Sequence, residues 1–480
     1  MSMTRNQLIE RAKAAATNGE LLQTLARRVS WRTESDGPRQ PQAAPELTGY
    51  LQEEIGPDLQ AMGFEIDILP NPETGHGPFL LARRIEGTHL PTLLTYAHGD
   101  VVNGQEAAWR SGLSPWTLTP ENGLWYGRGT ADNKGQHTVL LTALAHTLQA
   151  RQNQLGYNLT LLMEMGEEAG SPGLARFCQE KRERLSANLF VACDGPRVQA
   201  ERPTLFLGSR GACNFSLQVN ARSRAYHSGN WGGVLSNPAM RLSHALACLV
   251  DAQGRIRIPA LLPPTPTPDL RHALSQVPVG GGPDDPALTP GWGEPGLSAA
   301  ERLVAWNTLE VLALGSGSVN RPINAIPASA TAQCQLRFVV GTDEHRIVDH
   351  IRHHLAAHGF GDVEVTAGMS CPATRLNLDN PWVHWALHSM QTSTGVKPVL
   401  LPNLAGSLPN DVFANILGLP TLWIPHSHPS CNQHAPNEHM LASVAQEGLA
   451  IMAGLFWDLG EPGHAPWTGA STSPEPTTAH

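Results

Sequence analysis

The chain has 480 residues, enough for two or three domains with a sizeable buried core. Its 33 Lys and Arg residues against 42 Asp and Glu residues give a formal net charge of −9, which offers no basic footprint for nucleic acid or for an anionic membrane. The longest apolar runs fall short of the ~18 to 20 residues that span a bilayer. These properties exclude nucleic acid and membranes as partners and favour small-molecule substrates.

The N-terminal segment and the cysteines both bear on the cellular compartment of the protein. Residues 1–29 alternate charged and apolar residues at helical spacing and lack the continuous apolar core of a secretory signal. The seven cysteines are widely scattered and form no CxxC pair, so we expect reduced thiols. The sequence therefore predicts a cytoplasmic protein.

Residues 1–206 and 375–460 share the alternation of strand-like and helix-like segments that is typical of an α/β domain. The expected strands are 79–84, 92–97, 158–165, 189–193, 203–208 and 420–424. The expected helices are 45–62, 136–151, 171–184, 380–392 and 437–455. Residues 461–480 are expected to be disordered because they are rich in Pro, Thr, Ser and Gly.

Residues 207–374 have a different pattern and predict a smaller, inserted two-layer α/β domain. Its expected elements are strand 213–219, helix 238–250, strand 333–340, helix 343–358 and strand 362–366. The Pro- and Gly-rich segment 258–297 predicts a long loop or a partly ordered excursion.

Histidine and acidic residues stand where the predicted strands of the first domain end. His98 and Asp100 follow strand 92–97, and because strand side chains alternate, both lie on one face if the chain stays extended. Asp100 could then orient the imidazole of His98, whose other nitrogen would be free for a metal. The alternative is a core histidine followed by a capping aspartate, the more frequent outcome for an isolated histidine.

Asp132 and Asp194 are two further candidate metal ligands in loops of the first domain. Asp132 lies between a Gly-rich turn and helix 136–151, where its two oxygens could bridge two cations. Asp194 ends strand 189–193. The alternative for each is a turn or helix-capping residue.

Glu167 and Glu168 are adjacent acids after strand 158–165. Adjacent acids at a buried strand end are costly to ionise unless cations or partners offset them. One could bind a metal while the other accepts a proton from water, and the alternative is a solvated helix start. His434, just before helix 437–455, brings the set to two histidines and three ligand carboxylates, a mixture suited to a divalent ion such as zinc.

The order of these motifs resembles the signature of the M20 dinuclear metallopeptidases, which include carnosinase-like dipeptidases, glutamate carboxypeptidases, aminoacylases and N-acyl-amino-acid deacylases. The resemblance covers residues 21–455 and rests on HGD at 98–100, GRGTADNKG around Asp132, GEEAGS at 166–171, CDG around Asp194, HSGNWGG at 227–233 and HAPNE at 434–438. It implies a catalytic α/β domain whose central mixed sheet is flanked by helices, with the inserted domain serving as lid and dimerisation domain.

The resemblance also implies a ligand set for two divalent ions, zinc in preference to manganese or cobalt. Asp132 would bridge both ions. His98 and Asp194 would complete one site, and Glu168 and His434 would complete the other.

Further roles follow from the same resemblance. Glu167 would be the general base, Asp100 would orient His98, and the peptide bond after Asp132 is expected to be cis. His227 would reach the site of a partner subunit and stabilise the oxyanion. Asn133 stands where many relatives carry an aspartate.

Substrate-binding positions are implied in and near the inserted domain. They are Asn324, Arg337, Gly406 and Ser407, and Arg337 could hold a substrate carboxylate through a bidentate pair. Without the resemblance, an arginine in an alternating strand would equally suit an outward-facing, solvated position.

The function expected is hydrolysis of an amide bond in a small peptide or an N-acyl amino acid by a homodimer. A dipeptidase or a carboxypeptidase-like exopeptidase is the main hypothesis. The alternatives are an N-acyl-amino-acid deacylase or carbamoyl amidohydrolase and, more remotely, a catalytically silent metal-binding scaffold. The presence of Glu167 beside the whole ligand set argues against the scaffold.

Overall fold

The computed structural model describes residues 3–35, 45–280, 282 and 285–467. The chain divides into two compact units. Unit 1 comprises Met1–Leu207, Leu376–Leu401 and Val412–His480, and unit 2 comprises Gly208–Arg375 and Pro402–Asp411. Residues 402–411, which the sequence placed in the second part of the catalytic domain, therefore cluster with unit 2.

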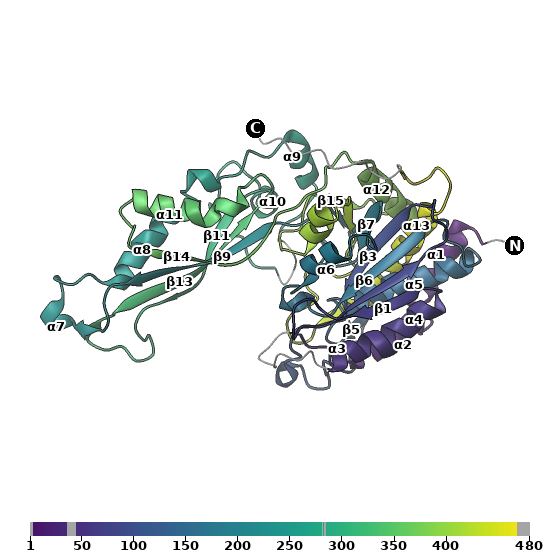
Figure 1. Cartoon of the computed structure of the whole chain (residues 1–480), viewed down its shortest axis with the longest axis horizontal. Helices are drawn as coiled ribbons and strands as arrows, with labels where there is room; N and C mark the ends of the chain where they lie inside the picture. The colour runs from purple at the N-terminus through teal and green to yellow at the C-terminus, as the bar shows by residue number, and fades with distance from the viewer. Residues whose placement is uncertain (1–2, 36–44, 281, 283–284, 468–480) are drawn as a thin grey trace. The chain divides into compact units, whose positions relative to one another are not determined.

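Unit 1 is built on an eight-stranded mixed sheet (Figure 1). In spatial order its strands are β1 (Glu65–Leu69), β2 (Phe79–Arg84), β6 (Asn158–Glu164), β3 (Thr92–His98), β7 (Leu189–Ala192), β16 (Thr421–Trp423), β8 (Thr204–Phe206) and β15 (Val399–Leu401). The central strands β6, β3, β7 and β16 pair in parallel. These strands are almost wholly buried. Their sequences are mainly apolar because parallel strands are covered on both faces of the sheet.

Helices of unit 1 pack around this sheet and hold its core together. They are α1 (Arg5–Ala14), α2 (Glu20–Ser30), α3 (Pro45–Gly49), α4 (Gly56–Ala61), α5 (Lys134–Ala150), α6 (Leu174–Glu180), α12 (Pro381–Thr394) and α13 (Ala442–Leu459). Helix α13 contacts α1, α5 and α12 and is buried on nearly every side, as its apolar sequence requires. A small second sheet joins β17 (His439–Leu441) to β5 (Leu124–Tyr126) and β4 (Thr119–Glu121).

Unit 2 is a two-layer α/β unit. Its antiparallel sheet has the order β11 (Thr308–Gly315), β13 (Ser329–Phe338), β9 (Gly211–Asn220) and β14 (Glu364–Cys371). Burial alternates along β9 and β13 because α8 (Pro238–Leu249) and α11 (Ile347–Ala357) cover one face. The short strands β10 (Tyr226–His227) and β12 (Ala325–Ile326) form a separate pair, next to α7 (Ser228–Trp231).

The expected fold class is confirmed, but several expected elements differ in detail. The terminal helix begins at Ala442 instead of residue 437, because residues 439–441 form β17. The excursion 258–297 contains α9 (Pro268–Leu274), and α10 (Ala299–Val304) follows it.

The tail expected to be disordered is partly structured. Trp467 packs edge-on against Trp382 of α12 with ring centroids 4.8 Å apart, which holds residues 461–467 against unit 1. Residues 468–480 lie outside the described residues.

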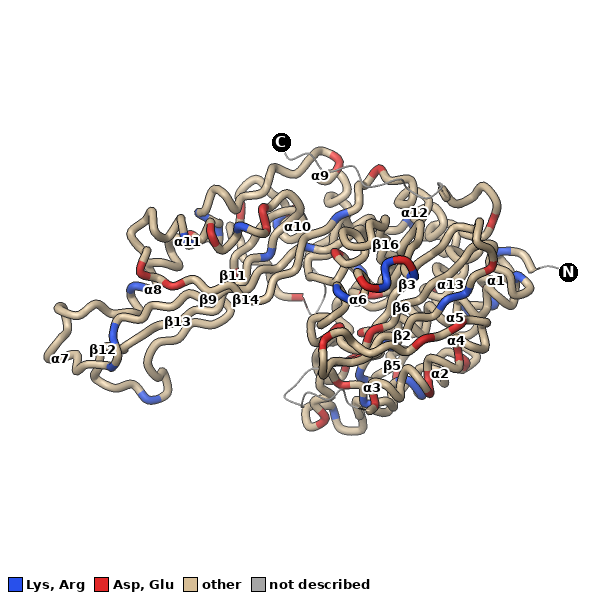
Figure 2. Tube along the Cα trace, in the orientation of Figure 1, with Lys and Arg blue, Asp and Glu red and all other residues tan. Residues whose placement is uncertain are grey.

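The described residues carry their charges in mixed sign. Lys and Arg residues are interspersed with Asp and Glu residues along both units (Figure 2). Among the helices of the described ranges, none has both the length and the apolar character that a membrane span requires.

Candidate metal centre

Several of the predicted site residues lie at the carboxyl ends of three neighbouring strands, at one edge of the sheet. Strand β3 ends at His98, β6 ends just before Glu167 and Glu168, and β7 ends just before Asp194. Because β3 pairs in parallel with both β6 and β7, their carboxyl ends meet at the same edge. Buried apolar strands thus fix the positions of the polar residues that follow them.

The first group of candidate ligands consists of His98, Asp132 and Asp194. Nε2 of His98 lies 2.9 Å from Oδ1 of Asp132 and 3.6 Å from Oδ2 of Asp194. One ligand atom from each residue lies within 4.8 Å of the others, and all three residues are buried. Two carboxylates and an imidazole at this spacing can hold one divalent ion.

The second group consists of Asp132, Glu168 and His434. Nε2 of His434 lies 3.1 Å from Oδ2 of Asp132 and 3.0 Å from Oε2 of Glu168. The side chain of His434 is 52% exposed, so this group is open to solvent on one side. Asp132 belongs to both groups and presents a different oxygen to each imidazole.

Asp132 reaches this position from the loop before α5. The peptide bond between Asp132 and Asn133 is cis, as expected. Asn133 donates from Nδ2 to the carbonyl oxygen of Cys193, 2.8 Å away, a bond that an aspartate could not make. The helix-capping alternative for Asp132 is wrong, because its carboxylate contacts His98, His434 and Gln433 instead.

Asp100 connects two of the strand ends. Nδ1 of His98 lies 3.1 Å from the carbonyl oxygen of Asp100 and 3.4 Å from its Oδ1. Because both of these neighbours are acceptors, Nδ1 carries a proton, and Nε2, which faces the carboxylates of Asp132 and Asp194, is the nitrogen that would bind a metal. The Asp100 carboxylate also accepts the backbone N–H groups of Glu167 at 3.1 Å and Glu168 at 3.0 Å, so it fixes the acidic turn as well as the imidazole.

A buried carboxylate that sequence reasoning did not assign supports the Asp132 loop. Glu438 pairs with the buried Arg128 at 2.7 Å. Its oxygens also accept the backbone N–H groups of Gly129 at 3.1 Å, Ala131 at 2.9 Å and Asp132 at 3.1 Å. Glu438 is the last residue of the HAPNE motif, which could have marked it as part of the site. The sequence instead predicted that Glu438 lies in the first turn of helix 437–455.

Burial and mutual repulsion raise the pKa values of the site acids. Burial, reinforced by the charge of Asp132, raises the pKa of Glu168 to about 8 and that of Asp194 to about 6. Burial and the neighbouring carboxylates also raise the pKa of Glu167 well above its usual range. Burial opposes the ionisation of Asp132 too, but hydrogen bonds from His434 and His98 hold its pKa far below the ordinary value.

These residues fit divalent ions. Oδ2 of Asp194 and Oε1 of Glu168 are buried and have no hydrogen-bond partner among the described residues. An ionised, unpaired oxygen in a buried position is costly, and a bound cation removes that cost. Aligned carboxylates and unprotonated imidazole nitrogens are the donors that zinc and similar ions take.

The predicted site residues of unit 2 lie in two groups, and the first contains Arg337, Gly406 and Ser407. Nη1 of Arg337 donates to Oγ of Ser407 at 2.7 Å, and Arg337 is half-buried on the face of β13 opposite its buried residues. A Cβ at the neighbouring Gly406 would meet only the Leu404 side chain, 3.7 Å away.

His227 and Asn324 make up the second group, on neighbouring segments of the chain. The carbonyl oxygen of Asn324 accepts the backbone N–H of Ser228 at 2.9 Å, and His227 pairs with Ala325 across β10 and β12. Both His227 and Asn324 are exposed.

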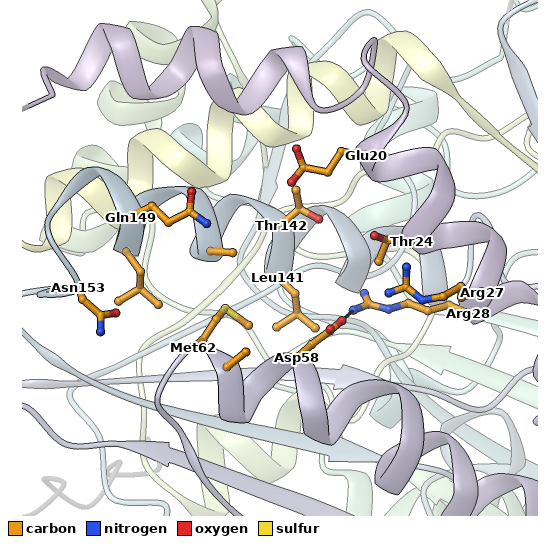
Figure 3. A pocket seen from close by; sticks show the side chains of 13 residues that line it. Glu20, Thr24, Arg27, Arg28, Asp58, Met62, Leu141, Thr142, Gln149 and Asn153 are labelled. Carbon is orange, nitrogen blue, oxygen red and sulfur yellow. Dashed lines mark hydrogen bonds and ion pairs between the residues drawn. The ribbon is translucent and has the colours of Figure 1, made fainter.

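A separate cavity of about 300 Å³ lies among α2, α4 and α5 (Figure 3). Arg28 and Asp58 both line this cavity and form an ion pair, with 2.8 Å between Nη2 of Arg28 and Oδ2 of Asp58. Its lining residues include none of the candidate ligands, so it is not part of the metal centre.

The model of peptidase family M20/M25/M40 matches residues 94–458. Over 187 residues the chain is 35% identical to the Beta-Ala-His dipeptidase of Mus musculus, covering 38% of this chain and 37% of the mouse protein. Over 202 residues it is 31% identical to the cysteinylglycine-S-conjugate dipeptidase of Corynebacterium striatum, covering 42% and 43% of the two chains. The matched region therefore spans less than half the length of each relative.

The crystal structure of human carnosine dipeptidase 1 is similar in fold. It matches with a TM-score of 0.75 and 21% identity, and the match covers 96% of this chain and 100% of the human chain. Since the family model spans well over half of the residues, the chain belongs to peptidase family M20/M25/M40.

Proposed function

We propose that this protein is a metal-dependent dipeptidase. The observation that carries the proposal is the position of Asp132, with one carboxylate oxygen facing His98 and the other facing His434. A carboxylate shared between two ligand groups suits two neighbouring divalent ions. Zinc is the ion that this donor set favours, with manganese and cobalt as alternatives. The dipeptidase names of the two relatives support a dipeptide as substrate.

The proposed mechanism assigns a task to each side chain. His98, Asp132 and Asp194 would hold one divalent ion, and Asp132, Glu168 and His434 would hold the other. Bound divalent ions polarise a substrate carbonyl and make a nearby water more acidic.

Proton transfer falls to Glu167. Its carboxylate takes a proton from the attacking water and gives it to the amine that leaves when the C–N bond breaks. Asp100 keeps Glu167 in place through the hydrogen bond to its backbone N–H.

Unit 2 supplies the substrate contacts in this proposal. The Arg337 guanidinium binds a substrate carboxylate, Ser407 and Gly406 contact the substrate backbone, and Asn324 is a further substrate contact. His227 stabilises the oxyanion of a substrate held by a second copy of the chain.

A homodimer through unit 2 belongs to the same proposal. Strand β11 is an edge strand, and its Val311, Leu312 and Leu314 side chains are 41%, 60% and 56% exposed. An edge strand with exposed apolar side chains favours pairing with another chain. We also place the protein in the cytoplasm, in line with its seven unpaired cysteines.

The test is hydrolysis of a panel of dipeptides and N-acyl amino acids by the metal-loaded protein and by Glu167→Gln. We expect dipeptide turnover, a loss of kcat of about 100-fold or more in the variant, and equal metal content in both proteins. Glu121→Gln, on the surface, is the matched control and should keep full activity. Turnover confined to N-acyl amino acids would replace the dipeptidase by a deacylase, and no turnover at full metal content would overturn the proposal.

A further inference from the structure

Unit 2 contains a second kind of metal-ligating cluster, between helices α8 and α11. One ligand atom each from Cys248, His354 and His358 lies within 4.8 Å of the others. Cys248 is in the last turn of α8, His354 is in the last turn of α11, and His358 is the C-terminal capping residue of α11. Helices α8 and α11 pack against each other, so the cluster sits where both helices end.

Backbone carbonyls orient both imidazoles. Nε2 of His354 lies 3.0 Å from the carbonyl oxygen of Cys248, and Nδ1 of His358 lies 2.8 Å from the carbonyl oxygen of His354. Because a carbonyl oxygen can only accept, each of these nitrogens carries the proton and the opposite nitrogen of each ring keeps its lone pair. A metal-binding histidine is commonly anchored in this way.

The two imidazole rings and the thiol lie close together, and one side of the cluster faces solvent. The two ring centroids are 4.2 Å apart with 33° between their planes, as expected for histidines four residues apart at a helix end. Cys248 is 8% exposed, His354 is half-buried and His358 is exposed. The thiol is thus enclosed by the protein while the His358 side faces solvent.

We propose that Cys248, His354 and His358 form a third metal site that takes a borderline ion of the zinc class and ties α8 to α11. One sulfur and two imidazole nitrogens suit zinc, whereas calcium and magnesium prefer oxygen. On binding, one sulfur–metal and two nitrogen–metal bonds form, and the Cys248 thiol loses its proton to water. The site is separate from the candidate metal centre of unit 1 and does not depend on the proposed peptidase activity.

The donor sets of the two sites allow a direct test. The metal centre of unit 1 offers only nitrogen and oxygen ligands. Among the ligand groups of the described residues, the cluster in unit 2 is thus the one that can give a thiolate-to-cobalt charge-transfer band. We would titrate the metal-free full-length protein with Co²⁺ and record near-ultraviolet absorption and bound metal per chain. The wild type should develop the band and should bind one ion more than Cys248→Ser.

Matched variants separate the cluster from other cysteines and histidines. His358→Ala should weaken cobalt binding by 10-fold or more. His353→Ala should not, although His353 is also exposed and its Nδ1 also lies near the carbonyl oxygen four residues earlier. Cys371→Ser, which changes a half-buried cysteine of the same unit outside the cluster, should keep the band. Absence of the band in the wild type, or its persistence in Cys248→Ser, would overturn the proposal, whatever the hydrolysis assay shows.

Discussion

At the residue scale, Glu438 is the clearest case of a side chain that acts through its neighbours. Its carboxylate neutralises Arg128 and accepts three backbone N–H groups of the loop that carries Asp132. We expect Glu438→Gln to lower the free energy of unfolding by about 3 kcal/mol or more, because the buried guanidinium loses its counter-charge. Urea unfolding measures this loss.

The same substitution should loosen the metal centre. An Asp132 loop without its anchor holds the carboxylate less firmly, so zinc affinity should fall by roughly 10-fold or more. Glu121→Gln removes a carboxylate from an exposed pair with Arg110 and should change stability by less than about 1 kcal/mol. Equal metal affinity in Glu438→Gln and the wild type would contradict the positioning role.

Glu164 predicts a pH dependence of stability. Burial, together with the charge of Asp100, raises its pKa to about 7 from an ordinary value near 4.5, although Tyr96 and Ser171 donate hydrogen bonds to it. Between these two values the folded protein binds more protons than the unfolded chain, so this group's contribution to stability falls as the pH rises and is constant above about 7.

The variant Glu164→Gln should remove this dependence. The free energy of unfolding of the variant minus that of the wild type should rise from pH 4.5 to 7 by an amount on the order of 3 kcal/mol. Urea unfolding of the metal-free proteins across that range measures it. A difference that stays constant with pH would show that Glu164 ionises normally.

At the scale of the elements, the sequence predicts best where burial imposes a simple pattern. The runs at 92–97 and 158–165 are apolar because β3 and β6 are covered on both faces, and the positions of His98 and Glu167 follow from their ends. The pairing of Asp132 with His434, 302 positions apart, could not be obtained from periodicity and came only from the motif order.

The elements that were missed lack such a pattern. The apolar run of α13 continues backwards into β17, so periodicity does not mark the boundary. Asn437 has a φ of 63°, a left-handed conformation that separates the His434 loop from the elements that follow, and asparagine tolerates it. Strand β11 was not predicted because most of its apolar residues are exposed and do not alternate with buried ones.

Close packing of α13 gives a prediction for that helix. A Cβ at Gly454 would lie 2.0 Å from Oγ of Ser393 in α12 and 2.8 Å from Nη2 of Arg5 in α1. An alanine in a helix interior ordinarily stabilises by about 1 kcal/mol over glycine. Here we expect Gly454→Ala to destabilise by about 1 to 3 kcal/mol, because the new methyl group must displace the Ser393 hydroxyl and disturb its hydrogen bond from Arg5.

A double-mutant cycle distinguishes this clash from a change in propensity. Ser393→Ala removes the nearest atom, so the double variant should be more stable than the sum of the two single changes implies. Thermal unfolding of the four proteins measures the coupling. Strict additivity would place the cause elsewhere than in the contact between α12 and α13.

At the scale of the whole molecule, the exposed edge of unit 2 predicts the oligomeric state. Leu312→Arg places a charge on the exposed edge strand β11, where pairing with a second copy is proposed, and should convert a dimer to a monomer in sedimentation velocity. Leu303→Arg, in α10 and 41% exposed, is the control and should remain dimeric. A wild type that is monomeric at all concentrations would contradict the dimer.

If His227 acts on the partner's substrate, two inactive chains should restore each other. His227→Ala keeps its own Glu167 but lacks an oxyanion donor for its partner, whereas Glu167→Gln keeps His227 but lacks the base. In a mixed dimer, the site with Glu167 faces the chain that still has His227, so that one site is complete. We expect activity to reappear when the two variants are unfolded and refolded together, and to stay absent when each is refolded alone. No recovery in a preparation that contains mixed dimers would mean that His227 serves its own chain, and the dimer would then not be needed for catalysis.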